Sequence, residues 1–207
     1  MTKNNSFIKH NNSVQDSIIQ SIRARKKGSI LFISAFEKFG SNEAVRQAFS
    51  QLQKKGFIVR LAKGIYLYPT STDNLSVSLE QIASEVAARD KAHILPVGAF
   101  AQHKLGLSSQ IPTNCVYITD GTPRLLKVGV RSIKFKKGVA KNFAYKSELI
   151  YLMVTALRDM FDLPDEQMER KLKELLKNEH PEIIKRDLAL APNRIRVYLQ
   201  ILFMQIS

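Results

Sequence analysis

Apolar residues recur every three or four positions through much of the first 55 residues, which is the spacing of amphipathic helices. Val14, Ile18 and Ile22 form one such face behind Ser13, a residue suited to capping a helix. Two short apolar runs farther on are joined at residues 62–64, which predicts a two-stranded hairpin. The predicted elements here are a helix from Ser13, a strand over residues 29–33, a brief helix over 35–40 capped by Ser34, a helix over 42–55 capped by Ser41, and hairpin strands over 57–61 and 65–69.

The helix predicted over residues 42–55 has two chemically different faces. Ser41 precedes it as an N-cap, and Glu43 places negative charge in its first turn, where the helix dipole favours it. Its apolar face consists of Val45, Ala48, Phe49 and Leu52. Its polar face consists of Glu43, Arg46, Gln47, Ser50 and Lys54. A helix, a strand, a short helix, a polar-faced helix and a hairpin follow one another in the order of a winged helix-turn-helix.

The rest of the chain predicts a second domain of mixed composition. Its predicted elements are a helix from Ser78 with the apolar face Leu79, Ile82, Ala83, Val86 and Ala87, a strand within 92–98, a helix over 99–106, a strand over 115–119, an exposed turn at 120–124, a strand over 128–138 that alternates at Val130, Ile133 and Phe135, and helices over 147–161, 164–178, 181–190 and 193–206. The predicted fold class is therefore α+β, with an N-terminal winged helix-turn-helix followed by a mixed α/β domain that ends in a helical segment. The predicted divisions are a disordered tail over 1–12, the winged helix over 13–70, and the C-terminal domain over 71–207, helical from about residue 147.

Positive charge is concentrated in the front of the chain. The whole sequence carries a net charge of +14, but residues 1–70 hold 12 Lys and Arg against 3 Asp and Glu, whereas residues 144–207 hold 10 of each. A basic region of this kind attracts polyanions. With one cysteine, no signal-like apolar stretch and no apolar run of membrane-spanning length, we expect a soluble cytoplasmic protein.

The sequence contains no pattern that predicts a catalytic, metal or cofactor site. Its four histidines are scattered, and neither a Walker motif nor a Gly-rich dinucleotide fingerprint occurs. Asp165, Glu169 and Lys171 resemble nuclease residues only distantly, and their helical spacing favours a charged helix face. We therefore predict no enzyme activity, no cofactor and no metal.

The polar helix face and the hairpin together form the predicted DNA-binding site. Arg46 and Gln47 can hydrogen-bond to base edges in the major groove, whereas lysines and hairpin cations suit phosphates. The predicted DNA-binding residues are Ser41, Asn42, Glu43, Arg46, Gln47, Ser50, Lys54, Lys55, Arg60, Lys63 and Gly64. Arg60 and Lys63 are expected at the hairpin tip, with Gly64 providing the positive φ of the turn. Tyr66 and Tyr68 are expected to pack rather than to stack on bases.

Two segments resemble a known family. AVRQAFSQLQKKGFIVRLAKGIYLYP resembles the winged-helix N-terminus of AbiEi-like antitoxins, the transcriptional regulators of type IV toxin–antitoxin systems of abortive infection. LPVGAFAQHKLGLSSQIPTNCVYITDGTPR is similar to the start of the second domain in a branch of uncharacterised bacterial proteins grouped with them. The resemblance spans about residues 14 to 140.

The resemblance implies a function that spacing alone does not. Such antitoxins bind inverted repeats in their own promoter, repress the operon, and oppose a nucleotidyltransferase-like toxin without forming a stable complex with it. Double-stranded DNA is therefore the expected partner, and no membrane is. Two alternative functions remain open: a regulatory or protein-interaction module without a toxin, and an RNA-binding protein. The apolar C-terminal helix is expected in the core, and its alternative role is an interface for a homodimer or a partner protein.

Overall fold

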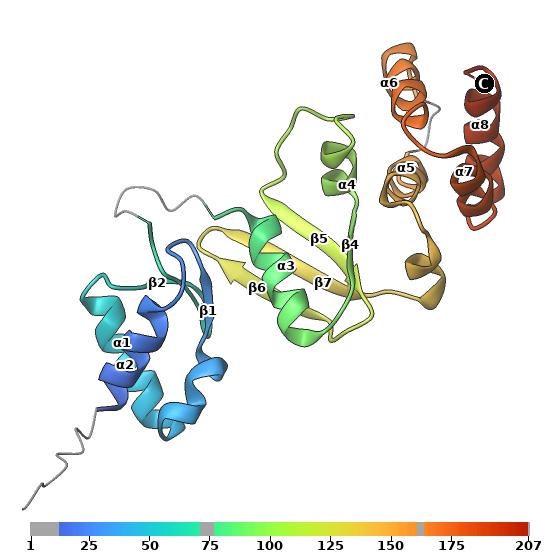
Figure 1. Ribbon diagram of the computed structural model, residues 1–207. Coiled ribbons are helices and arrows are strands. Elements are labelled where there is room, and N and C mark those ends of the chain that lie inside the picture. Colours follow the sequence, from blue (N-terminus) through green and yellow to red (C-terminus); the bar gives the residue numbers. More distant parts are fainter. Residues whose placement is uncertain (1–12, 71–76, 161–163, 207) are drawn as a thin grey trace, which may run out of the picture. The chain divides into compact units, whose positions relative to one another are not determined.

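The computed structural model describes residues 13–70, 77–160 and 164–206 (Figure 1). It divides into two compact units, Met1–Ser78 and Leu79–Ser207. Over the described residues it is a mixed α+β protein with one small sheet in each unit. The predicted disordered tail at 1–12 and residues 71–76, at the start of the predicted C-terminal domain, lie outside the described residues. The elements of the N-terminal unit are α1 (Val14–Arg23), β1 (Ile30–Phe32), the 3₁₀ helix η1 (Ile33–Phe39), α2 (Asn42–Lys54), β2 (Val59–Ala62) and β3 (Ile65–Leu67).

The core of the N-terminal unit joins its three helical elements to its sheet. Ile18 and Ile22 of α1 are fully buried together with Phe36 of η1 and Phe49 of α2. The Phe49 ring lies 5.1 Å from that of Phe36 and 4.9 Å from that of Tyr66 on β3, centroid to centroid. Edge-to-face and tilted aromatic contacts of this kind stabilise a core beyond the area they bury. The expectation that Tyr66 packs is confirmed.

Two predicted details of this unit are wrong. The brief helix predicted over 35–40 is a 3₁₀ helix that already begins at Ile33, so Ser34 lies inside it and does not cap it. Arg60, expected at the tip of the hairpin, instead lies within β2 opposite Tyr66. The sheet order is β1-β3-β2, with all pairs antiparallel. The pairing of β1 with β3 closes the unit around α2.

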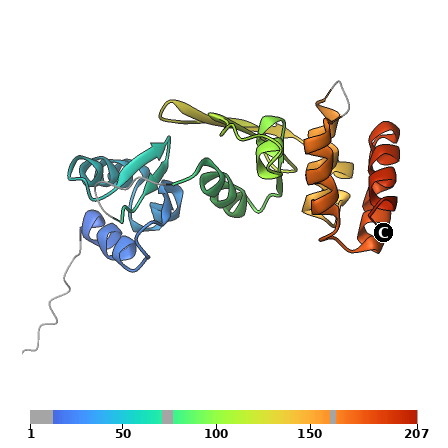
Figure 2. The same cartoon turned by 90° about the horizontal axis from the view of Figure 1, so that it is seen from above.

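The second unit begins with a helix packed on a four-stranded sheet (Figures 1 and 2). Its elements are α3 (Leu79–Asp90), β4 (Ile94–Val97), α4 (Ala99–Lys104), β5 (Asn114–Thr119), β6 (Arg124–Val128), β7 (Arg131–Lys137), the 3₁₀ helix η2 (Ala140–Ala144), α5 (Glu148–Arg158), α6 (Glu166–Leu176), α7 (Pro181–Leu188) and α8 (Asn193–Met204). The sheet order is β4-β5-β7-β6, and β5 and β7 run parallel whereas the other pairs are antiparallel. All five residues of the predicted apolar face of α3 are buried.

The strand predicted over 128–138 is β7, with Ile133 and Phe135 buried, but it begins later than predicted, at Arg131. β6 was not predicted: it ends at Val128, and Val130 in the turn between the two strands is 97% exposed. Arg124, at the end of the predicted exposed turn, is only partly exposed. It opens β6, forms an ion pair with Asp90, and lies 5.5 Å from the centroid of the Phe135 ring.

The four C-terminal helices α5–α8 agree with the predicted ones to within a few residues, and residue 161 of the first prediction lies outside the described residues. Every residue from Ile150 to Leu157 of α5 is buried, so α5 is the centre of this part. The expectation that α8 is buried holds for one face only. Ile195, Leu199 and Leu202 are buried. Val197, Ile201 and Met204 are exposed. Within the described ranges, no helix is long and apolar enough to span a bilayer.

Candidate functional site

Helix α2 carries a polar face that its own packing turns outward. Ser41 caps it as predicted: the backbone N–H of Ala44 donates to the Ser41 Oγ over 3.2 Å. The four predicted apolar residues are all buried, from 0% exposed for Phe49 to 4% for Ala48. Because those residues lie against the core, the opposite side of the helix faces solvent. The predicted site residues Ser41, Asn42, Glu43, Arg46, Gln47, Ser50, Lys54 and Lys55 are all exposed.

The hairpin β2–β3 presents its cations at and near a tight turn. Ala62 pairs with Ile65, so Lys63 and Gly64 form a two-residue turn. Gly64 has a φ of +74°, a conformation that disfavours any side chain, and a Cβ there would lie 3.3 Å from Cγ2 of Ile33. Lys63 and Arg60 are both exposed. The predicted role of Gly64 in the turn is thus supported by its backbone geometry.

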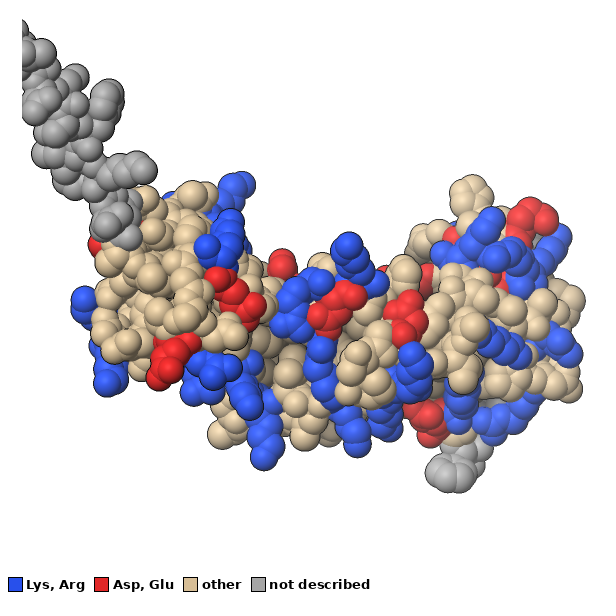
Figure 3. Space-filling model, turned by 90° about the horizontal axis from the view of Figure 1, so that it is seen from below, with Lys and Arg blue, Asp and Glu red and all other residues tan. Residues whose placement is uncertain are grey.

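The Lys and Arg residues within 13–70 are exposed. None of the Lys or Arg residues in 13–70 forms an ion pair with a carboxylate of the described residues. Two of them contact aromatic rings instead: Arg25 lies 5.2 Å from the Phe36 centroid and Lys38 lies 5.1 Å from the Phe39 centroid. Lys and Arg side chains stand out from this unit on the face drawn in Figure 3. An outward cation without an anionic partner in its own chain is available to an external anion.

A second group of cations, at the end of α1, was not part of the predicted site. Lys26 and Lys27 are exposed and directly precede Gly28. The backbone N–H of Gly28 donates to the Tyr68 carbonyl over 2.6 Å, and the N–H of Tyr68 donates to the Ser29 carbonyl over 2.9 Å. These bonds attach the two lysines to the end of the hairpin that is remote from its turn. The basic run RARKKG was visible in the sequence, but only the pairing places it beside the hairpin.

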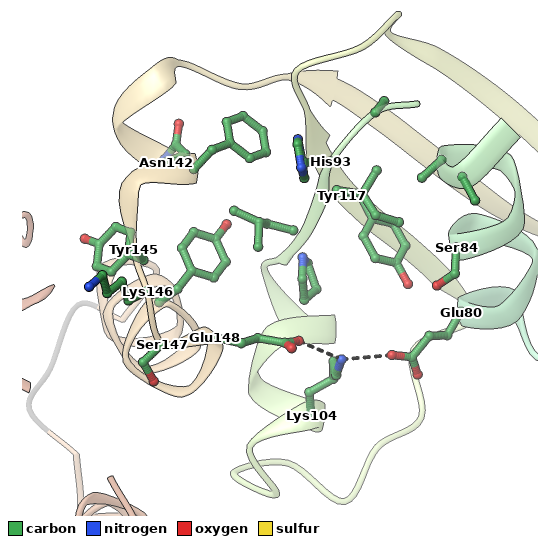
Figure 4. A pocket seen from close by; sticks show the side chains of 18 residues that line it. Glu80, Ser84, His93, Lys104, Tyr117, Asn142, Tyr145, Lys146, Ser147 and Glu148 are labelled. Carbon is green, nitrogen blue, oxygen red and sulfur yellow. Dashed lines mark hydrogen bonds and ion pairs between the residues drawn. The ribbon is translucent and has the colours of Figure 1, made fainter. Parts of the chain in front are cut away.

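The second unit contains a cavity of about 720 Å³ that sequence patterns did not predict. Its walls come from α3, β4, α4, β5, η2 and the start of α5. Glu80, Lys104 and Glu148 meet at one side of it, and Tyr117 points toward that side from β5 (Figure 4). These residues come from four separate elements, so no local spacing links them.

The acidic residues of the nuclease-like fragment are engaged in local contacts of helix α6. Asp165 caps α6 by accepting from the Met168 N–H over 2.8 Å, and Glu169 pairs with Lys173 over 2.7 Å. No cluster of three or more His, Cys, Asp or Glu in the described part of the chain is arranged to hold a metal ion.

Comparison with known proteins places the chain by family and by fold. The family described as "Family of unknown function (DUF6088)" matches residues 17–184, and the chain belongs to this family. Among solved structures, the chain is similar to the crystal structure of the RV2827C protein from Mycobacterium tuberculosis, with 17% identity and a TM-score of 0.53. The alignment covers 92% of this chain and 80% of that one, and at this identity it indicates a related fold only. No curated protein matches the chain.

Proposed function

We propose that the N-terminal unit is a winged helix-turn-helix and that the protein is a sequence-specific, DNA-binding transcriptional regulator. The observation that carries this proposal is the set of exposed cations on α2 and the β2–β3 hairpin without a carboxylate partner in the described chain. Helix α2 has 13 residues and is therefore roughly 20 Å long, and the major groove is about 12 Å wide. The helix can lie in that groove with its buried face toward the protein.

The residues of this surface have different roles in the proposal. Arg46 and Gln47, on the outward face of α2, hydrogen-bond to base edges and give sequence preference. Lys54 and Lys55 at the end of α2, with Arg60 and Lys63 of the hairpin, bind phosphates and fix the position of the protein on the duplex. Neither role requires a catalytic group, and the proposed function is not enzymatic.

Two resemblances support a narrower proposal: that of residues 44–69 to AbiEi-like antitoxins, and that of residues 95–124 to the bacterial proteins grouped with them. The regulator represses its own promoter at inverted repeats and is the antitoxin of a type IV system, opposing a nucleotidyltransferase-like toxin without a stable complex. An inverted repeat consists of two half-sites related by two-fold symmetry, and a homodimer has the same symmetry. The exposed side chains of Val197, Ile201 and Met204 on α8 supply an apolar surface for a homodimer.

A salt titration of DNA binding tests the central proposal. If each protomer neutralises six to eight phosphates, log K falls against log[salt] with a slope of about −5 to −7. The full chain is titrated into a fluorescent duplex from its own promoter, a scrambled duplex and a single-stranded RNA, at several salt concentrations. The expected result is tightest binding to the promoter duplex with that slope. An affinity that does not change with salt rejects polyanion binding. Tighter binding to the RNA than to either duplex means that RNA, and not DNA, is the ligand.

The α8 surface also favours a second candidate, a protein-interaction module that needs no DNA. This candidate predicts that Ile201→Ser abolishes partner or self-association without any change in the salt slope. Sedimentation velocity of the wild type and the variant tests self-association through α8, and a strict monomer in both cases removes the support for it. The DNA titration above then distinguishes the two candidates, since only the first requires tight binding to the promoter duplex.

A further inference from the structure

Three buried hydroxyls at the cavity of the second unit, those of Tyr117, Tyr145 and Tyr151, have no hydrogen-bond partner among the described residues. Tyr117 of β5 is 3% exposed and Tyr151 of α5 is 2% exposed. The Tyr151 hydroxyl lies near that of Thr155, but both oxygens are without a properly placed partner in the described chain. Buried polar groups are almost always hydrogen-bonded, so such hydroxyls mark a place where a ligand can bond.

The phenols of Tyr117 and Tyr151 remain neutral and can each donate a hydrogen bond. Burial raises the pKa of Tyr117, and negative charge nearby, from Glu80 and Glu148 among other groups, raises it further. Burial likewise raises the pKa of Tyr151. The ring of Tyr117 is held in place by Phe100 and Phe135, whose centroids lie 5.5 and 5.9 Å away. The hydroxyl is therefore a fixed, uncharged group at the cavity.

The charged groups in this part of the cavity have an excess of one negative charge. The Nζ of Lys104 lies 2.8 Å from Oε1 of Glu80 and 3.0 Å from Oε1 of Glu148 (Figure 4). One lysine between two glutamates gives a formal charge of −1. Because each carboxylate uses only its Oε1 atom for Lys104, the second oxygen of each is left for a further donor. Lys146 also lines the cavity, but its amino group points away from these three residues in Figure 4.

The protonation state of Lys104 limits the reactions that the site can support. Burial opposes its charge, but hydrogen bonds and attraction from Glu80 and Glu148 prevail and raise its pKa. The amine is therefore protonated at neutral pH and is not a nucleophile. At another wall, the Nδ1 of His93 lies 2.7 Å from Oδ2 of Asp120. The site suits binding rather than covalent chemistry.

The remaining walls combine polar side chains, such as Ser84 and Asn142, with apolar ones. The apolar ones include Ala87, Leu95 and the flat ring of Phe143. At about 720 Å³ the space is within the range of small-molecule sites, which combine such walls with a few polar groups that fix orientation.

We propose that this cavity binds a small organic cation with a flat body, an aromatic amidine or amine. Its N–H groups donate to the free oxygens of Glu80 and Glu148, and the Tyr117 hydroxyl bonds a polar atom of its body. A cation neutralises the excess charge of the cluster, whereas an anion would meet two carboxylates. The proposal concerns the second unit alone and does not depend on DNA binding by the first.

Benzamidine and benzamide are a matched pair of probes for this site. The two molecules have nearly the same shape, but only benzamidine is a cation at pH 7. Isothermal titration of the full chain is expected to give a Kd of about 1 mM or tighter for benzamidine and much weaker binding for benzamide. The proposal is overturned if the two probes bind equally, or if benzamidine does not bind at about 10 mM.

Charge variants locate the bound cation. Glu80→Gln and Glu148→Gln are each expected to raise the Kd for benzamidine by at least about tenfold, because each removes a charged acceptor. Glu182→Gln, on the exposed surface of α7, is the matched control and is expected to leave the Kd unchanged. If all three variants bind as the wild type does, the cation does not sit between these carboxylates and the proposal is wrong.

A hydroxyl variant separates binding from folding. Tyr117→Phe removes a buried hydroxyl that has no partner in the described chain, so it is expected to raise the Tm of the free protein by about 2 °C or more. In the same variant the Kd for benzamidine is expected to rise about fivefold. Tyr198→Phe is the control, since that hydroxyl bonds Glu169 outside the cavity. A Tyr117→Phe protein with a lower Tm, or with unchanged benzamidine affinity, contradicts the assignment of this hydroxyl to a ligand.

Discussion

The cations of residues 13–70 and those of the C-terminal helices are placed in opposite ways. In the first region they are exposed and have no ion-pair partner in the described chain. In the second region five of them lie beside carboxylates: Arg170 with Glu166, Lys171 with Glu174, Lys173 with Glu169, Lys185 with Glu182 and Arg186 with Asp187. Blue and red side chains accordingly lie next to each other over these helices in Figure 3. A cation that is already paired with a carboxylate of its own chain attracts an external anion less strongly, whereas an unpaired exposed cation is available to bind one.

The largest effect is expected where charge in the C-terminal region is buried. Asp187 is 0% exposed and accepts from the backbone N–H groups of Lys146 and Ser147 over 2.9 and 2.7 Å, and from Arg186 over 3.1 Å. Asp187→Ala leaves these donors without an acceptor and is expected to lower the free energy of unfolding by about 3–5 kcal/mol. Urea unfolding followed by circular dichroism measures the loss.

The amide variant sharpens this result. Asp187→Asn keeps an acceptor oxygen but removes the charge, so it is expected to lose less stability than Asp187→Ala. A loss below about 1 kcal/mol for the alanine variant shows that the backbone at the start of α5 is held by other bonds. In that case the buried charge of Asp187 contributes no more to the free energy of unfolding than an exposed charge does.

In the N-terminal unit the same kind of change is expected to affect binding and not stability. Arg60→Ala combined with Lys63→Ala removes two proposed phosphate contacts, which at about 0.15 M salt weakens DNA binding roughly 30-fold and reduces the salt slope by about 2. Both side chains are exposed, so the free energy of unfolding changes by less than about 0.5 kcal/mol. Fluorescence anisotropy and urea unfolding give the two quantities.

A control with the same change in net charge tests position. Lys171→Ala combined with Lys185→Ala removes two cations that have carboxylate neighbours in the C-terminal helices. DNA affinity is expected to stay within about threefold of the wild type. An equal loss in both double variants shows that total charge, and not the hairpin, controls binding.

The two regions also differ in how much of them the sequence predicts. Helix α2 was predicted with its cap Ser41 and its buried stripe, because both signals are local: a capping side chain and apolar residues at helical spacing. Helices α5 to α8 were predicted for the same reason. β6 was missed, because its adjacent Leu125 and Leu126 hide the alternation of a strand whose pairing with β7 is what defines it.

The candidate sites follow the same division. The exposed cations of α2 could be predicted, since a side chain opposite a buried stripe has to face solvent. The cavity could not, because Glu80, Lys104, Tyr117 and Glu148 are brought together only by the packing of α3, α4, β5 and α5. The fact that Tyr117 has no hydrogen-bond partner in the described chain is likewise a property of the folded state alone.

A smaller effect is expected for base recognition. Arg46→Ala or Gln47→Ala removes one proposed contact to a base edge, which is worth about 1–3 kcal/mol of discrimination. The ratio of promoter affinity to scrambled-duplex affinity is therefore expected to fall about tenfold, while the scrambled duplex is bound much as before. Competition titrations with both duplexes measure this ratio. An unchanged ratio in both variants means that α2 does not lie in the groove in the proposed orientation.

A pH-dependent effect is expected in the C-terminal helices. Burial, followed by the negative charge of Glu169, raises the pKa of Tyr198 to about 12. Because the phenol of an unfolded chain ionises near pH 10, the folded state holds this proton more tightly, and stability falls as pH rises from about 10 toward 12. Tyr198→Phe is expected to make that decline shallower. Urea unfolding at pH 9 and pH 11 checks it, and an identical decline in both proteins contradicts the assigned pKa.

The smallest effect is expected for exposed ion pairs, which limits what the opening comparison can mean. Arg170 and Glu166 lie four residues apart on α6, with side chains 73% and 81% exposed. Water solvates both groups almost as well as each solvates the other, so Arg170→Ala is expected to change the free energy of unfolding by less than about 0.5 kcal/mol. Urea unfolding at low salt and at about 0.5 M salt measures this change in the free energy of unfolding. A loss above about 1 kcal/mol that disappears at high salt makes pairing a source of stability, whereas the expected null result leaves pairing as a way of keeping these cations from binding polyanions.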